Sequence, residues 1–150
     1  MIRVLQLNCG RVESVMNALG VVARENGINV CLLREPLVRN SRVVGLSAGM
    51  NVFNNEWAVI MVDSNEIDMM CVKECTNECA VCVRINIKKG PMYGCTIYCK
   101  FNRKTEPYLE YLERVIDCAN GSPLIVGMDR PCAIAKLLKK QEKGRRKAIC

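Results

Sequence analysis

The 150-residue chain is half hydrophobic and has a formal net charge of +7, which suits one globular domain with its own core. None of its apolar runs approaches the roughly 18 residues that span a bilayer, and residues 1–10 become polar too early for a secretory signal peptide. We therefore expect an intracellular protein, nuclear or cytoplasmic, with no membrane contact. The absence of histidine excludes Ser-His and Cys-His nucleophiles, His-ligated zinc and His general bases.

The beginning of the chain has the pattern of a strand, a helix and a second strand. Residues 2–7 alternate as in a strand, and residues 12–23 place apolar side chains at the i, i+3, i+4 spacing of an amphipathic helix. Asn26-Gly27 is a typical helix end. Residues 28–33 are nearly all apolar, as in a buried parallel strand. These elements predict a βαβ unit with a right-handed crossover.

The rest of the chain mixes further strands with one more long helix. In chain order we predict a loop over 36–51, a strand over 57–62, a Cys-rich loop over 63–78, strands over 80–87 and 92–99, a helix over 105–119 and a strand over 124–128. Thr105 is the expected N-cap of that helix. The pattern indicates a layered α/β domain over residues 1–132, followed by a basic amphipathic tail over residues 133–150.

Eleven cysteines raise the question of a metal site. The densest group, Cys71, Cys75, Cys79 and Cys82, has the spacing C-x3-C-x3-C-x2-C. This spacing differs from the paired knuckles of zinc sites, and the chain has no histidine for a mixed site. The pattern favours free thiols that act as small hydrophobic residues in a reducing compartment.

The positive charge is concentrated in the tail, residues 133–150. Seven basic residues against Glu142 alone give the tail +6 of the chain's +7. The basic residues are Lys136, Lys139, Lys140, Lys143, Arg145, Arg146 and Lys147. Such a segment can bind the phosphate backbone of DNA or another anionic surface, and a solvated helix end is the alternative interpretation.

Four predicted strands are each followed by a polar side chain that could take part in chemistry. These side chains are Asn8, Glu35, Tyr98 and Asp129. Ligands of open α/β sheets bind at the carboxyl ends of the strands, and an amide, two carboxylates and a phenol gathered there would suit Mg²⁺. The alternative is that these residues only end their strands.

The segments "VLQLNCGRVESVMNAL", "CLLREP", "TIYCKFN" and "PLIVGMD" occur in this order over residues 2–129. Together they resemble the endonuclease domain of non-LTR retrotransposons, in the endonuclease/exonuclease/phosphatase superfamily. The resemblance implies a four-layer α/β sandwich with two sheets packed face to face. It also implies a DNA endonuclease that depends on Mg²⁺ or Mn²⁺ and nicks its target by phosphodiester hydrolysis.

The resemblance implies a role for each strand-end residue. Glu35, in Arg-Glu-Pro, corresponds to the metal-binding glutamate, and Asn8 to the asparagine beside the metal. Tyr98 corresponds to the tyrosine that contacts the scissile phosphate. Asp129 corresponds to an aspartate that orients the substrate and the attacking water. The metal would polarise a phosphate oxygen and stabilise the leaving oxyanion.

Two features depart from the family pattern. Pro131 stands where the family has an asparagine, and proline has neither a side-chain amide nor a backbone donor. The family also continues into a Ser-Asp-His motif with a catalytic histidine, which this chain lacks. Losing such a group costs orders of magnitude in rate. We therefore expect a sandwich that is incomplete at its C-terminus and a nuclease that is weakened or inactive.

Two alternatives to a weakened nuclease remain open at this point. One is a non-catalytic remnant that binds nucleic acid through the basic tail, with an affinity that falls steeply with salt. The other is a fragment with no molecular function of its own. In such a fragment an incomplete sheet would leave an unpaired edge, through which the chain could associate with itself.

Overall fold

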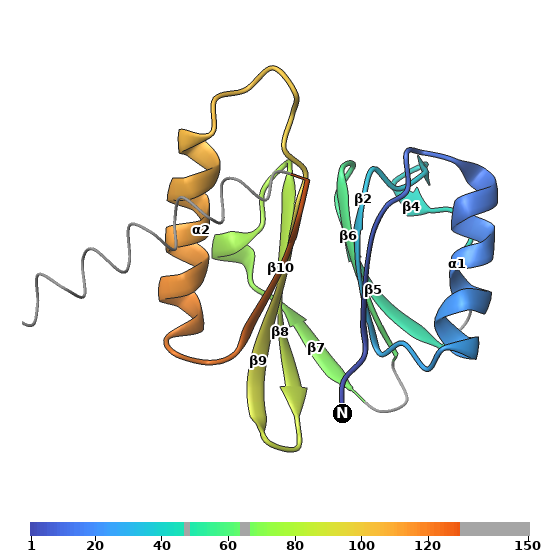
Figure 1. Ribbon diagram of the computed structural model, residues 1–150, viewed down its shortest axis with the longest axis horizontal. Coiled ribbons are helices and arrows are strands. Elements are labelled where there is room, and N and C mark those ends of the chain that lie inside the picture. Colours follow the sequence, from blue (N-terminus) through green and yellow to red (C-terminus); the bar gives the residue numbers. More distant parts are fainter. Residues whose placement is uncertain (47–48, 64–66, 130–150) are drawn as a thin grey trace, which may run out of the picture.

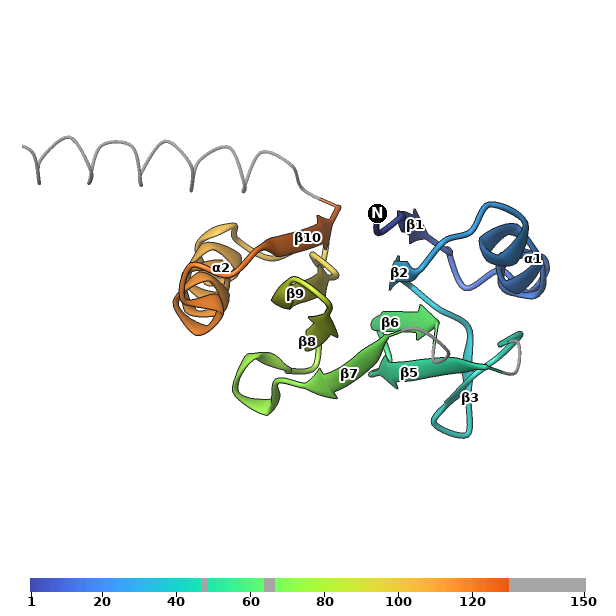
Figure 2. The ribbon, with the colours of Figure 1, turned by 90° about the horizontal axis from the view of Figure 1, so that it is seen from below.

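The computed structural model describes residues 1–46, 49–63 and 67–129. Two sheets pack face to face, and one helix covers the outer face of each sheet (Figures 1 and 2). Helix α1 (Glu13–Glu25) covers the first sheet and α2 (Glu106–Ala119) the second. This four-layer arrangement confirms the predicted α/β sandwich.

Each of the two main sheets has four strands. The first has the order β1 (Val4–Asn8), β2 (Val30–Arg34), β6 (Ala58–Asp63) and β5 (Met50–Asn54). The second has the order β10 (Leu124–Met128), β9 (Gly90–Ile97), β8 (Ala80–Ile87) and β7 (Asp68–Cys71). A short hairpin of β3 (Val38–Arg39) and β4 (Arg42–Val43) and a 3₁₀ turn, η1 (Lys73–Cys75), complete the described elements.

Strand direction brings four carboxyl ends to one end of the molecule. β1 pairs in parallel with β2, with Val4 opposite Val30, and β10 pairs in parallel with β9, with Leu124 opposite Tyr93. The other ladders of the main sheets are antiparallel. In Figure 1 the carboxyl ends of β1, β2, β9 and β10 all lie at the top, where the two sheets face each other.

The alternation of side chains along β2 and β6 divides the core into layers. Leu32 and Ile60 point toward the second sheet, whereas Leu33 and Met61 point toward α1. All four are fully buried, so both faces of these central strands are covered. This explains why residues 28–33 and 57–62 have uninterrupted apolar sequences rather than an alternating pattern.

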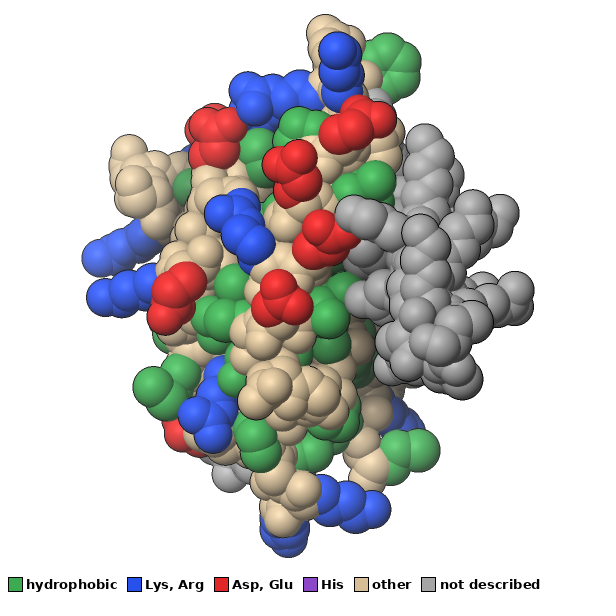
Figure 3. Space-filling view, turned by 90° about the vertical axis from the view of Figure 1, so that its left-hand side faces the viewer, with side chains coloured by type: hydrophobic (Ala, Val, Ile, Leu, Met, Phe, Trp, Pro, Cys, Tyr) green, Lys and Arg blue, Asp and Glu red, His purple; other side chains and the backbone are tan. Residues whose placement is uncertain are grey.

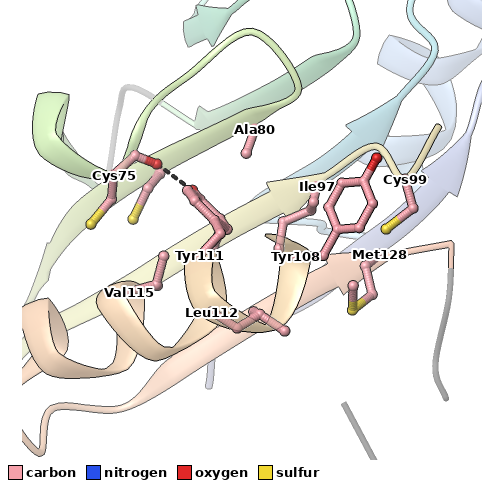
Figure 4. Packing of buried hydrophobic residues seen from close by; sticks show 11 residues of the cluster. Cys75, Ala80, Ile97, Cys99, Tyr108, Tyr111, Leu112, Val115 and Met128 are labelled. Carbon is pink, nitrogen blue, oxygen red and sulfur yellow. Dashed lines mark hydrogen bonds between the residues drawn. The ribbon is translucent and has the colours of Figure 1, made fainter. Parts of the chain in front are cut away.

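Helix α2 packs on the second sheet through a cluster that includes cysteines and tyrosines (Figure 4). The Tyr111 hydroxyl donates a hydrogen bond to the Cys75 carbonyl and lies 3.3 Å from the Cys95 sulfur. Burial raises the pKa of the Cys75 thiol to about 12, so this thiol stays protonated at neutral pH. None of the nine cysteines in the described ranges forms a disulfide, and within those ranges no three His, Cys, Asp or Glu side chains converge to hold a metal.

The structure corrects two predicted loops. Residues 36–51 contain β3, β4 and the start of β5, and residues 63–78 contain β7 and η1. Both β5 and β7 lie at the edges of their sheets, where one side of a strand faces solvent. Their sequences, MNVFN and DMMC, are therefore more polar than those of the central strands.

The helix boundaries agree with the prediction in all but one detail. Helix α1 ends at Glu25 and α2 at Ala119, with the predicted Asn26 and Asn120 as their C-caps, and Asn120 adopts a left-handed conformation. Thr105 precedes α2, but its side chain makes no capping hydrogen bond. The reason is that Thr105 already has helical backbone angles, φ −79° and ψ −28°, whereas a capping residue is typically extended.

Strands β1 and β10 each have one neighbour in the described part of the chain. They lie at the same side of the sandwich (Figure 2), so the expected self-association through an open edge stays a prediction for this side. No described helix is long and apolar enough to cross a membrane.

Candidate active site

Glu35 and Asn8 meet at the carboxyl ends of the parallel strands β1 and β2. The Asn8 side-chain amide donates a hydrogen bond to Glu35 Oε1 at 2.9 Å. The Asn8 amide oxygen accepts one from the Gly10 backbone N–H, also at 2.9 Å. Asn8 thus orients the glutamate, while a backbone contact fixes Asn8 itself.

The backbone of Glu35 is held in an uncommon conformation. Its φ is +47°, in the left-handed region that costs residues other than glycine about 1–2 kcal/mol. The Glu35 N–H donates to the Trp57 carbonyl at 2.9 Å, and the Glu35 carbonyl accepts from the Arg11 N–H at 2.8 Å. Neighbouring segments therefore impose this conformation and turn the carboxylate toward Asn8. Backbone strain of this kind clusters at functional sites.

Asp129 follows β10 and reaches across to the first sheet. Its Oδ1 accepts a hydrogen bond from Nε of Arg34, the last residue of β2, which is 5% exposed. Asp129 Oδ2 and Arg34 Nη1 are buried and have no hydrogen-bond partner among the described residues. The two sheets approach closely here, since a Cβ on Gly127 would lie 3.2 Å from Arg34 Nη1. The site therefore contains a desolvated carboxylate oxygen able to accept a further hydrogen bond.

Tyr98 lies one residue beyond β9, on an aromatic stack. Its ring stacks on Trp57 with centroids 4.7 Å apart and planes 10° from parallel. The guanidinium of Arg11 lies 4.2 Å from the centre of the Trp57 ring, and the ammonium of Lys100 lies 5.7 Å from it. Two cations thus accompany the tyrosine at this end of the molecule.

The pKa of Tyr98 is raised from its ordinary value. Burial is the main cause, and the negative charges of Glu35 and Asp129 add to it, while Arg11 opposes them. The phenol therefore keeps its proton at neutral pH and can donate a hydrogen bond to an anionic ligand.

The structure thus brings Asn8, Glu35, Tyr98 and Asp129 to one end of the sandwich. Pro131 and the seven basic tail residues (Lys136, Lys139, Lys140, Lys143, Arg145, Arg146 and Lys147) lie outside the described residues. Sequence reasoning missed Arg34, Trp57 and Arg11. A charged residue at the end of an otherwise apolar strand was the available signal for Arg34.

A solvent-open groove of about 550 Å³ adjoins Glu35. Its lining consists of Arg11, Pro36, Leu37, Val38, Ser41, Asn54, Asn55 and Glu56. The groove lies between the hairpin of β3 and β4 and the turn that joins β5 to β6. Its amide and hydroxyl groups provide hydrogen-bonding partners beside the candidate site.

Comparison with solved structures identifies the fold. The chain superimposes on the endonuclease domain of TRAS1, a telomere-specific non-LTR retrotransposon, with a TM-score of 0.75 and 25% identity, covering 86% of this chain and 58% of that one. It also matches D. rerio TDP2 complexed with a single-strand DNA product, with a TM-score of 0.59 and 13% identity, covering 91% and 64%. The chain therefore has the endonuclease/exonuclease/phosphatase fold.

Comparison with curated proteins identifies the family. The chain is 34% identical over 127 residues to the putative 115 kDa protein in type-1 retrotransposable element R1DM of Drosophila melanogaster, a match that covers 83% of this chain. The chain belongs to the endonuclease domains of non-LTR retrotransposons, which confirms the resemblance seen in the sequence. It spans 12% of the length of the Drosophila relative. No protein-family model matches the chain.

Proposed function

We propose that this chain is a Mg²⁺- or Mn²⁺-dependent DNA endonuclease that nicks one strand by phosphodiester hydrolysis. The observation that carries the proposal is the Asn8–Glu35 hydrogen bond of 2.9 Å. It holds a carboxylate at the strand ends, near Tyr98 and Asp129, in a chain of this retrotransposon family. Relatives of the same fold that process DNA support nucleic acid as the substrate.

The residues of the site fit a hard divalent cation. Mg²⁺ typically uses one or two protein carboxylates and completes its shell with water and substrate phosphate. Glu35 supplies one carboxylate, and Asp129 Oδ2 has no other partner among the described residues. The Asn8 amide oxygen already accepts the Gly10 N–H, so we expect Glu35 to bind the metal and Asn8 to hold Glu35 in place. When bound, the metal would polarise a phosphate oxygen and stabilise the leaving oxyanion.

The remaining side chains have complementary roles in this proposal. Tyr98, kept protonated, donates a hydrogen bond to a phosphate oxygen, and Arg11 contributes positive charge beside it. Asp129 accepts a hydrogen bond from the attacking water through Oδ2, while Arg34 fixes the other oxygen. The chain has no histidine to act as an imidazole base, so we expect slow hydrolysis.

A plasmid-nicking assay tests the activity. We expect the full chain to convert supercoiled plasmid to open circles with Mg²⁺ and to stop when the metal is chelated. Glu35→Gln should lower the rate at least about a hundredfold, the scale of losing one catalytic group. Glu110→Gln, the same change on the exposed face of α2, is the control. Cleavage that survives Glu35→Gln would remove Glu35 from the site.

Metal binding can be measured without activity. In urea denaturation, Mg²⁺ at about ten times its dissociation constant should raise the free energy of unfolding by about 1.4 kcal/mol. Glu35→Gln should abolish this increase. An equal increase in both chains would place the metal elsewhere.

A second candidate is binding without cleavage, favoured by the seven basic tail residues and the missing histidine. Its affinity for DNA should fall steeply with salt. Deleting residues 133–150 should abolish binding, whereas Asp129→Ala should not change it. Unchanged binding after the deletion would rule out the tail as the DNA contact.

A further inference from the structure

The loop between β9 and α2 carries an exposed aromatic side chain among cations. Phe101 is 90% exposed, which is unusual for so large an apolar residue. Lys100, Arg103 and Lys104 flank it in the sequence KFNRK. Hydrophobic burial does not explain a phenyl ring at this position, and an exposed aromatic ring among basic side chains is a feature of surfaces that bind single-stranded nucleic acid.

The loop is attached to the candidate site. Tyr98, the proposed phosphate contact, lies three positions before Phe101, and the Lys100 ammonium lies 5.7 Å from the centre of the Trp57 ring on which Tyr98 stacks. Figure 1 shows the loop extending beyond the carboxyl ends of the strands, at the end of the molecule where the site lies. A nucleic acid whose phosphate reaches Tyr98 therefore has its neighbouring nucleotides within reach of this loop.

The base of the loop is held in place. The Lys100 N–H donates to the Tyr108 hydroxyl at 2.8 Å, which ties the loop to the first turn of α2. The Arg103 N–H donates to the Lys100 carbonyl at 3.2 Å, and this bond closes a turn around Phe101. The side chains of Lys100 and Arg103 also lie 3.4 and 3.7 Å from Glu78, exposed pairs that contribute little stability.

The charge on the neighbouring surface restricts where a polyanion can lie. The outward face of α2 carries Glu106, Glu110, Glu113 and Asp117 against Arg114. Figure 3 shows acidic side chains over the middle of that face and Lys and Arg side chains at its upper end. A phosphate backbone is repelled from the helix and attracted to the loop.

We propose that Phe101 is a stacking residue that takes an unpaired or displaced base next to the scissile phosphate, with Lys104 and Arg103 binding the adjoining backbone. This inference rests on the proposed function, because it names the form of DNA that the same site takes. It assigns to this loop a preference for DNA in which a base has left the stack. A phenyl ring stacks on any base, so the preference concerns DNA structure rather than sequence.

The test is a binding measurement on two labelled duplexes of equal length, one fully paired and one with a single unpaired base. The full-length chain is used without divalent metal, so that no cleavage occurs. Phe101→Ala should weaken binding to the duplex with the unpaired base about tenfold, within the range for loss of one base–aromatic stack. Its affinity for the paired duplex should change less than about twofold.

Three further variants serve as controls. Phe101→Tyr keeps an aromatic ring and should bind both duplexes as the wild type does. Lys104→Gln should weaken both to the same extent and reduce the salt dependence. Lys89→Gln, the same charge change in the turn between β8 and β9, should bind both duplexes as the wild type does. Since Phe101 is exposed, thermal melting should be unchanged in Phe101→Ala, which verifies that the variant is folded.

Equal binding of both duplexes by Phe101→Ala and the wild type would overturn the inference, as would an equal loss for both duplexes. If the wild type nicks plasmid in the same preparation, the proposed function stands and only the stacking role fails. If the wild type binds neither duplex and does not nick, the proposed function fails as well. If Phe101→Ala reduces only self-association in sedimentation, the loop contacts protein instead and the inference is wrong.

Discussion

Arg34 and Asp129 lie 95 residues apart in the chain and form an ion pair across the two sheets. Arg34 ends β2 in the first sheet, and Asp129 follows β10 in the second. The Arg34 side chain is 6% exposed and that of Asp129 is 22% exposed. The pair therefore joins the sheets at the same place where it orients a proposed catalytic carboxylate.

Substitution of Asp129 and substitution of Arg34 should reduce the free energy of unfolding by different amounts. Asp129→Ala leaves a buried guanidinium without a counterion and should reduce the free energy of unfolding by about 3 kcal/mol. Arg34→Met leaves unpaired the more exposed of the two side chains, that of Asp129, and should cost less. The double variant should lie within about 1 kcal/mol of the wild type, because a hydrophobic replacement of a buried pair is often neutral. Urea denaturation of the four chains measures this, and additive losses would show that the pair is not coupled.

The left-handed backbone conformation at residue 35 should make any residue other than glycine unfavourable for stability there. Glu35→Gly and Glu35→Ala both lose the hydrogen bond from Asn8, but only glycine adopts a φ of +47° without strain. We expect Glu35→Gly to be more stable than Glu35→Ala by about 1 kcal/mol. Thermal melting of the pair measures the difference. Equal stability would show that the backbone at residue 35 relaxes when the carboxylate is removed.

Trp57 should act on catalysis through Tyr98. Trp57→Leu removes the ring on which Tyr98 stacks and should lower the nicking rate about tenfold or more, because a small displacement of a contact group is costly. Trp57→Phe retains an aromatic ring and should keep most of the rate. Nicking assays at saturating plasmid compare the two variants. If both lose activity equally, the indole has a role other than supporting the tyrosine ring.

Buried thiols under α1 should make the fold sensitive to alkali. Burial raises the pKa of Cys9 and of Cys31 to about 11, from an ordinary value of 9.0. As pH rises, the unfolded chain loses these protons first, so the stability they contribute is complete below pH 9 and is lost between about pH 9 and 11.

The pH dependence of the unfolding free energy measures the contribution of these thiols. Cys31→Ala should reduce the dependence of unfolding free energy on pH by up to about 1.4 kcal/mol per pH unit in that window. Val59→Ala, a non-titrating change in the same cluster, should lower stability without altering the slope. An unchanged slope in Cys31→Ala would show that this thiol ionises as readily in the folded chain as in the unfolded one.

Strands that are buried on both faces could be predicted from sequence, because burial leaves a continuous apolar run. The edge strands β5 and β7 could not, since they have solvated sides and polar residues that resemble loops. The same reasoning predicted that Glu35 and Asn8 lie close together, because both come at the ends of strands. It could not pair Arg34 with Asp129, because the contact depends on how two sheets face each other. Trp57 was assigned to the strand over 57–62, although β6 begins at Ala58 and the indole belongs to the site.

Trp57 is the chain's single tryptophan, and its ring lies against Tyr98, Arg11 and Lys100. Indole fluorescence responds to stacked rings and nearby charges, so all of the tryptophan emission of this chain comes from the candidate site. A phosphate that draws Arg11 away from the indole should change that emission before any bond is cut. Occupancy of the site can therefore be followed without a label, even in a chain that cleaves slowly or not at all.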